Sequence, residues 1–142
     1  MFINEEELIP VIVHYRKSGH QFIAYPDVRF TQEKMSEELR KKFKKLTVQM
    51  KPLTWGMYNN LQDSATIDTE EGKRRFVYKI YKENRLKTLI MKWDATNVNA
   101  AGEIVAVPPT EDNILKLSPD IAEAILESYE NASLMTNEDE KK

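Results

Sequence analysis

Two histidines, His14 and His20, limit the catalysis that this sequence can support. A serine nucleophile needs a neighbouring base to take its proton, and histidine is the usual base. Both histidines flank the turn of a predicted β-hairpin, and no catalytic triad can be assembled around them. A two-histidine metal site would need a further ligand at metal-binding spacing, and the sequence offers none. We therefore expect no enzyme activity, no metal and no cofactor.

An oxygen-rich segment contains Asp94, Thr96, Asn97 and Asn99, side chains of the kind that hold calcium. A calcium loop of the EF-hand type requires an oxygen ligand at its fifth position and glycine at its sixth. Here those positions hold Val98 and Asn99, so we interpret the segment as a solvated connection. The four glycines of the chain are too widely spaced for a phosphate-binding loop.

The basic run at residues 40–45, Arg-Lys-Lys-Phe-Lys-Lys, is the strongest candidate for nucleic-acid binding. Clustered cations beside an aromatic ring can hold phosphates and stack a base. The same run would also close a predicted helix whose first half is acidic, where it can pair with Glu37 and Glu38 one turn away. We therefore expect a solvated helix end without useful affinity for nucleic acid.

Composition indicates one soluble domain. The chain has 142 residues, of which 41% are hydrophobic and 31% charged, and a domain of this size can bury a core. Its net charge of −2 neither attracts polyanions nor strongly repels them. The lack of cysteine favours a reducing compartment, and no apolar run approaches the ~20 residues that span a bilayer. Because the first seven residues end in three glutamates where a signal peptide needs positive charge, a signal peptide is not expected either, and we predict a cytoplasmic protein without membrane contact.

The pattern of the first part of the chain, residues 1–30, predicts β-structure. Residues 9–15 and 21–25 are rich in β-branched and aromatic side chains, and Gly19 lies between them. This arrangement is typical of a β-hairpin or a small antiparallel sheet. Pro10 has no amide donor, which suits the start of a strand or a sheet edge.

Residues 31–132 are predicted to be mainly helical, with about four helices, which makes the fold class α+β. A helix over 31–45 would begin at Thr31 and carry acidic residues early and basic residues late. Another would follow residue 54, and the longest periodic segment, 73–93, would be the central helix.

The C-terminal part contains two proline-marked helix starts. A short strand is expected over 103–107, followed by helices that begin after Thr110 and at Pro119. The last residues, 133–142, are acidic and polar and cannot bury enough apolar surface to become ordered. We therefore predict one domain over 1–132 and a disordered tail.

Apolar residues at helical spacing indicate which side chains form the core. The predicted core residues are Phe76, Ile80, Ile90, Trp93, Ile125 and Leu126. If the last two are buried, replacing either by alanine should cost ~2–5 kcal/mol of stability.

A second set of apolar side chains is the predicted protein-binding surface. Three residues form a narrow stripe on the predicted 31–45 helix, too narrow to be buried on more than one side. Three more lie at the start of the next helix, and methionine, tryptophan and tyrosine suit contact with a partner. The six candidates are Met35, Leu39, Phe43, Trp55, Met57 and Tyr58. The alternative is that these side chains cover the core of this domain itself, and for Trp55 that alternative is favoured.

The order of these elements resembles the tail assembly chaperones of tailed bacteriophages. The resemblance covers about residues 50–132 and is carried by four segments. These are Leu-Thr-Trp-Gly-Met-Tyr at 53–58, Asn-Arg-Leu-Lys-Thr-Leu-Ile-Met-Lys-Trp-Asp at 84–94, Gly-Glu-Ile-Val-Ala-Val-Pro at 102–108, and Leu-Ser-Pro-Asp-Ile-Ala-Glu-Ala-Ile-Leu-Glu-Ser-Tyr at 117–129. Residues 1–49 have no counterpart in that pattern, so the resemblance does not explain their role.

The resemblance implies a non-catalytic factor in the host cytoplasm that coats an apolar tape-measure protein until tube subunits replace it. Other tail proteins, the tape-measure or the tube protein, would be its partners. An alternative within the same setting is a structural tail or baseplate component retained in the virion. A non-phage adaptor and a weak nucleic-acid binder are the other classes left open, as is a homo-oligomer.

Overall fold

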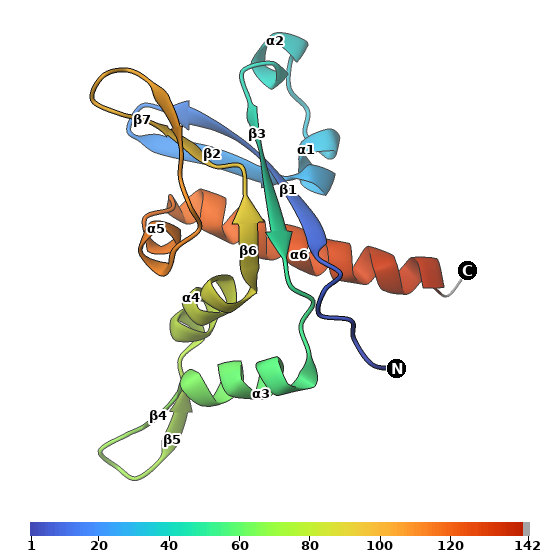
Figure 1. The fold of residues 1–142 in the computed structure, drawn as a ribbon, viewed down its shortest axis with the longest axis vertical. Helices are drawn as coiled ribbons and strands as arrows, with labels where there is room; N and C mark the ends of the chain where they lie inside the picture. The colour runs from blue at the N-terminus through green and yellow to red at the C-terminus, as the bar shows by residue number, and fades with distance from the viewer. Residues whose placement is uncertain (141–142) are drawn as a thin grey trace.

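The computed structural model describes the chain path of residues 1–140 and the side-chain surroundings of residues 1–133. The helices of this part are α1 (Asp27–Gln32), α2 (Glu37–Arg40), α3 (Trp55–Ser64), α4 (Tyr78–Leu89), α5 (Glu111–Leu115) and α6 (Pro119–Glu140). The strands of this part are β1 (Ile9–Ser18), β2 (Gln21–Pro26), β3 (Lys44–Met50), β4 (Thr66–Asp68), β5 (Arg74–Phe76), β6 (Ile90–Trp93), β7 (Thr96–Val98) and β8 (Ile104–Ala106). Four of them form an antiparallel sheet in the order β2-β1-β3-β6, which the long helix α6 crosses (Figure 1).

The predicted N-terminal hairpin is confirmed. Strands β1 and β2 pair antiparallel from Ser18 opposite Gln21 to Val13 opposite Pro26. Gly19 in the turn has a φ of 64°, a conformation that residues with a Cβ rarely adopt. The hairpin thus follows from local turn chemistry and from β-branched side chains on both sides of the turn.

Strand β3 begins at Lys44, inside the predicted 31–45 helix, and that prediction was wrong. The strand alternates buried Leu46, Val48 and Met50 with less buried Thr47 and Gln49, a period of two that fits a sheet with one covered face. It pairs with β1 along its whole length. Extended backbone therefore begins at Lys44, inside the segment that was predicted to be helical.

In the first half of the same segment α1 ends at Gln32 and a separate turn, α2, begins at Glu37, and Arg40 bonds to the end of α1. Its guanidinium donates to the carbonyls of Phe30 and Glu33, both at 2.7 Å, which satisfies the C-terminal end of α1. A new turn, α2, then starts at Ser36, whose hydroxyl accepts from the amide of Leu39. In a continuous helix these carbonyls would instead accept from backbone amides four residues further along the chain.

The predicted central helix, 73–93, is shortened at both ends. Its first residues form β5, and its last four form β6. The helix ends where Ile90 turns to extended backbone, with φ −71° and ψ 120°. There the Leu89 carbonyl accepts from the amide of Lys51 at 2.8 Å, and Trp93 comes to lie opposite Val48 of β3. Strand pairing therefore replaced the last helical turn.

These differences correct the predicted fold class. The chain is mixed α+β as expected, but β3 and β6 join the N-terminal hairpin in one sheet, so residues 31–132 are not a mainly helical region of about four helices. The helices starting after Thr54 and Thr110 and at Pro119 are confirmed. The predicted tail, 133–142, falls almost wholly outside the described side chains and stays a prediction.

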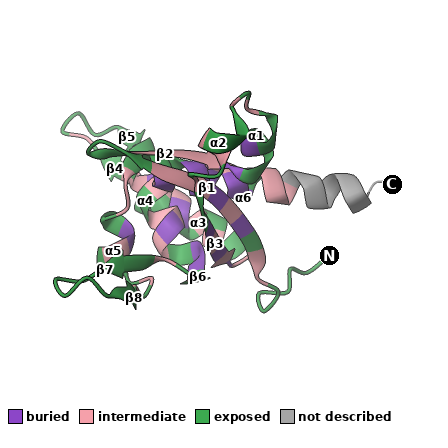
Figure 2. Ribbon diagram, turned by 90° about the horizontal axis from the view of Figure 1, so that it is seen from above, coloured by how far each residue is buried: buried purple, intermediate pink, exposed green. Residues whose placement is uncertain are grey.

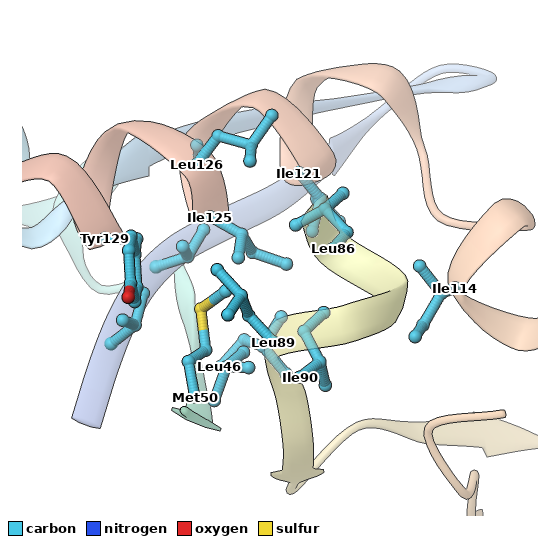
Figure 3. Close-up of a cluster of buried hydrophobic side chains, with 14 residues drawn as sticks. Leu46, Met50, Leu86, Leu89, Ile90, Ile114, Ile121, Ile125, Leu126 and Tyr129 are labelled. Atoms are coloured by element: carbon cyan, nitrogen blue, oxygen red, sulfur yellow. The ribbon is translucent and has the colours of Figure 1, made fainter. Parts of the chain in front are cut away.

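The core lies between the sheet, α4 and α6 (Figure 3). Of the predicted core residues, Ile125, Leu126 and Ile90 are buried. Trp93 is partly buried against this core, and Ile80 is partly buried against a second, smaller hydrophobic cluster. Phe76 was wrongly predicted to be in the core, because it is 43% exposed on the short strand β5. Figure 2 shows that buried residues gather at the centre, whereas the β4–β5 and β7–β8 hairpins are largely exposed.

Tyr129 joins α6 to the end of the sheet. Its hydroxyl donates to the carbonyl of Lys51 at 3.0 Å, and its ring is almost completely buried. Burial raises the pKa of the Tyr129 phenol above its ordinary value, so the neutral, hydrogen-bond-donating form is favoured in the folded chain.

Candidate functional site

The six predicted binding residues lie in two separate places. Met35, Leu39 and Phe43 belong to the segment between α1 and β3, whereas Trp55, Met57 and Tyr58 belong to α3. Figure 1 shows α2 and α3 toward opposite ends of the long axis of the molecule. The structure therefore does not unite them in one surface.

Phe43 is enclosed by other side chains on the sheet face opposite α6. Its ring centroid lies 5.0 Å from that of Phe30 and 5.9 Å from that of Tyr25, and the guanidinium of Arg16 lies 5.6 Å above it. An aromatic side chain held in this way is part of the fold. Phe43 is therefore poorly placed to bind a partner.

Met35 and Leu39 are half-buried and share no helical stripe. Met35 lies in the connection between α1 and α2, and Leu39 lies on the single turn of α2. The helix on which they were predicted to align does not form, so their i,i+4 spacing does not place them on one face of a helix.

Helix α3 presents an exposed aromatic pair, Trp55 and Tyr58. Thr54 caps the helix, because its hydroxyl oxygen accepts from the amide of Met57 at 3.2 Å. Met57 and Leu61 face the interior, whereas Trp55 and Tyr58, three residues apart, lie on the opposite side of the helix and face outward. Trp55 is 79% exposed and Tyr58 is 42% exposed. We call these two side chains the α3 aromatic pair.

Sequence reasoning missed other exposed apolar residues. Tyr78 lies on the first turn of α4, and Val98 and Ile104 lie on the β7–β8 hairpin, and all three are strongly exposed. The β4–β5 hairpin, which displays Phe76, was missed because the periodicity of 73–93 predicts one helix. The sequence signal for the β4–β5 hairpin was Gly72 in its turn. For the β7–β8 hairpin it was Gly102 together with the short strand predicted over 103–107, which β8 confirms.

The two histidines lie in different surroundings: His14 contacts other side chains of the fold, and His20 lies in a turn. His14 Nε2 lies 2.6 Å from Oδ1 of Asp27, and the His14 ring stacks on Phe30 with centroids 4.0 Å apart. His20 is exposed in the hairpin turn. Within the described side chains, no group of three or more His, Cys, Asp or Glu could hold a metal ion.

The oxygen-rich segment forms a hairpin whose polar side chains bond to the backbone. Asn99 Oδ1 accepts from the amides of Ala101 at 3.0 Å and Glu103 at 2.9 Å, which fixes the turn between β7 and β8. Asp94 Oδ1 accepts from the Thr47 amide at 2.8 Å. These oxygens support the chain path, and the segment is solvent-exposed as expected but forms a β-hairpin.

The basic run at 40–45 does not close a helix, which corrects that prediction. It spans the end of α2, a turn and the start of β3. Arg40 is engaged by the carbonyls at the end of α1, and its guanidinium lies 4.8 Å above the Phe30 ring. The four lysines of the run are exposed. The predicted lack of nucleic-acid affinity stays a prediction.

A cavity of about 350 Å³ lies between β2, α4 and α6. Three ion pairs border it, namely Lys82 with Glu123, Arg85 with Glu130, and Arg29 with Glu127. The hydrogen bond to Glu123 raises the pKa of Lys82. Because each cation already faces a carboxylate of α6, the cavity has no uncompensated charge with which to attract an anion.

Comparison with models of protein families, with curated proteins and with solved structures finds no match to this chain. Among the described helices, none is both long enough and apolar enough to cross a membrane. The candidate site rests on geometry alone, namely the exposure of Trp55 and Tyr58 on the capped helix α3.

Proposed function

We propose that this chain is a protein-binding factor without catalytic activity, and that the α3 aromatic pair is part of its binding surface. The carrying observation is the 79% exposure of Trp55 on the first turn of a helix that Thr54 caps. Tryptophan and tyrosine supply much of the binding energy at protein interfaces, and burying them recovers a large apolar area. A rigid helix that presents both rings loses little entropy on binding.

The more specific proposal is a role as a phage tail assembly chaperone. It is supported by the resemblance over residues 50–132, whose first segment, 53–58, contains Trp55 and Tyr58. In this role the chain would act in the host cytoplasm and shield apolar parts of a tape-measure or tube protein. It would need no cofactor and no contact with membrane or nucleic acid. The alternative is a structural tail or baseplate component retained in the virion.

Trp55→Asp and Tyr58→Asp are expected to abolish or strongly reduce copurification with the co-expressed tape-measure protein. Either substitution places a charge where an apolar ring would be buried against the partner. Aspartate in the first turn suits the helix dipole, so the W55D chain itself should keep its stability within about 0.5 kcal/mol. Pull-down yield and soluble fraction of the partner are the measurements.

Ile104→Asp is the matched control, because Ile104 is also exposed but lies on the β7–β8 hairpin. This variant should copurify like the parent chain. If both α3 variants fold and still solubilise the partner as the parent does, the α3 aromatic pair is not the binding surface.

Mass spectrometry of purified virions distinguishes the two phage roles. A chaperone that tube subunits displace should be abundant in infected-cell lysate and missing from particles. Peptides of this chain in particles, at amounts comparable to known structural proteins, would instead support the retained tail or baseplate component.

A further inference from the structure

Strand β2 forms one outer edge of the sheet, so one side of its backbone has no partner strand in the described part of the chain. The two-residue turn after Ser18, with Gly19 at its first position, makes Ser18 and Gln21 a hydrogen-bonded pair. Such pairs alternate along an antiparallel hairpin. Every second residue from Gln21 therefore points its amide and carbonyl toward β1, and Phe22 and Ala24 point theirs outward.

Two hydrogen bonds made by the backbones of β1 and β3 support this alternation. Ile12 of β1 and Thr47 of β3 lie opposite each other, and their backbone groups point away from each other. The Ile12 carbonyl accepts from the Ser128 hydroxyl at 3.0 Å. On the other side, the Thr47 carbonyl accepts from the Asp94 amide at 3.2 Å. The alternation assigned to β1 and β2 is thus consistent with the neighbouring strands.

The two edges of the sheet are protected very differently. Strand β6 is only four residues long, carries Lys92, and pairs with β3 through a register shift between Gln49 and Met50. Short length, a lysine and an irregularity all discourage pairing with another chain. Strand β2, Gln-Phe-Ile-Ala-Tyr-Pro, is six residues long and has no charged side chain. Only Pro26, at its end, interrupts the row of amides.

We propose that β2 pairs antiparallel with β2 of a second copy of this chain, about a two-fold axis, and so joins two sheets into one. One register uses every outward amide. In it, the backbone amide and carbonyl of Phe22 in each copy bond to those of Ala24 in the other copy. Ile23 then lies opposite the second copy's Ile23 at the axis. Pro26, which lacks an amide, lies beyond the last hydrogen bond.

The residues brought together in this register fit one another, which favours a second copy over a foreign strand. The large Phe22 lies beside the small Ala24 on the covered face, and no like charges are opposed within the new ladder. A surface that complements itself gives a closed dimer. The nearby carboxylates of Glu123 and Glu127 on α6 are already paired with Lys82 and Arg29, so their repulsion across the axis is reduced.

Ala24→Pro tests the edge directly, because it removes an outward amide without removing a bond to β1. The parent chain should show a concentration-dependent dimer in sedimentation equilibrium. The A24P chain loses two intermolecular hydrogen bonds, so its dissociation constant should rise about tenfold or more. Circular dichroism and thermal unfolding check that the variant folds.

A charge pair at Ile23 tests the register and does not depend on the proline variant. Ile23→Lys and Ile23→Glu should each weaken the dimer, because equal charges meet at the axis. Mixing the two variants should restore dimers that contain one copy of each. Gln49→Lys is the control, since Gln49 lies on the same sheet face but in β3, and its dimer should match the parent's.

Three outcomes would overturn the proposal, which does not rest on the tail-assembly role. A parent chain that stays monomeric at the highest soluble concentration would do so. A parent dimer that neither A24P nor the charged Ile23 variants weaken would place the interface elsewhere. A monomeric parent whose binding to a tail protein is lost in the folded A24P chain would assign the edge to a foreign strand.

Discussion

Ile125→Ala is expected to lower the free energy of unfolding by about 2–5 kcal/mol. Ile125 is 0% exposed and lies on α6 where that helix meets the sheet and α4. Figure 3 shows its side chain among those of Leu86, Leu89 and Met50. Removing most of it leaves a cavity with walls from three elements, which cannot all collapse into the space. Urea denaturation followed by circular dichroism measures the loss.

The neighbouring Leu126→Ala variant should cost less than Ile125→Ala. Leu126 is also buried, but it lines the charged cavity between β2 and α6, where the surroundings can adjust and water can enter. Leu115→Ala is the control, because Leu115 is exposed on α5 and should change stability by no more than about 0.5 kcal/mol. Equal losses for Ile125 and Leu115 would contradict the packing described for α6.

Phe30→Ala is expected to cost about 3–5 kcal/mol and to loosen the whole segment from α1 to β3. The Phe30 ring is 8% exposed although it lies on a short helix. It stacks on His14, lies 5.0 Å from the Phe43 ring and is covered by the Arg40 guanidinium. Its loss removes the apolar contacts that hold this segment on the outer face of the sheet.

Hydrogen exchange distinguishes local from global loosening in the Phe30→Ala chain. Amides of 27–43 should lose protection more than those of α6, because the Phe30 ring contacts His14, Phe43 and Arg40, whereas α6 is held mainly by its packing on β1 and β2. Val28→Ala provides the comparison, since Val28 lies on the same helix but is exposed. Unchanged exchange across 27–43 would mean that Phe30 does not anchor this segment.

Local chemistry in the sequence was enough to place several elements. The turn at Gly19, the cap at Thr54 and the proline at the first position of α6 each act within a few residues, and the structure has each element where those signals predicted it. Burial of Ile125 likewise followed from helical periodicity on α6. These features depend on backbone geometry and hydrogen bonds that neighbouring residues supply.

The exposed candidate site was only half foreseen. Trp55 and Tyr58 were chosen for their residue types, and the capped helix holds both outward. Phe43 was chosen from a helical stripe, but it packs against Phe30 and Tyr25, which come from elsewhere in the chain. Whether an aromatic residue covers its own domain or faces solvent depends on those neighbours, and spacing alone does not reveal them.

The sequence by itself determined the hairpin, the helix starts and the α+β class, because turn, capping and alternation signals act locally. The tertiary structure decided the rest. The short segment 90–93 fits either a helical or a strand period, and 44–50 alternates only from Leu46 onward, after two lysines that also suit the end of a helix. They become strands because each finds a partner far away in sequence, β1 for the first and β3 for the second. Strand preference depends on such pairing more than on the residue itself, so it could not be read from either segment alone.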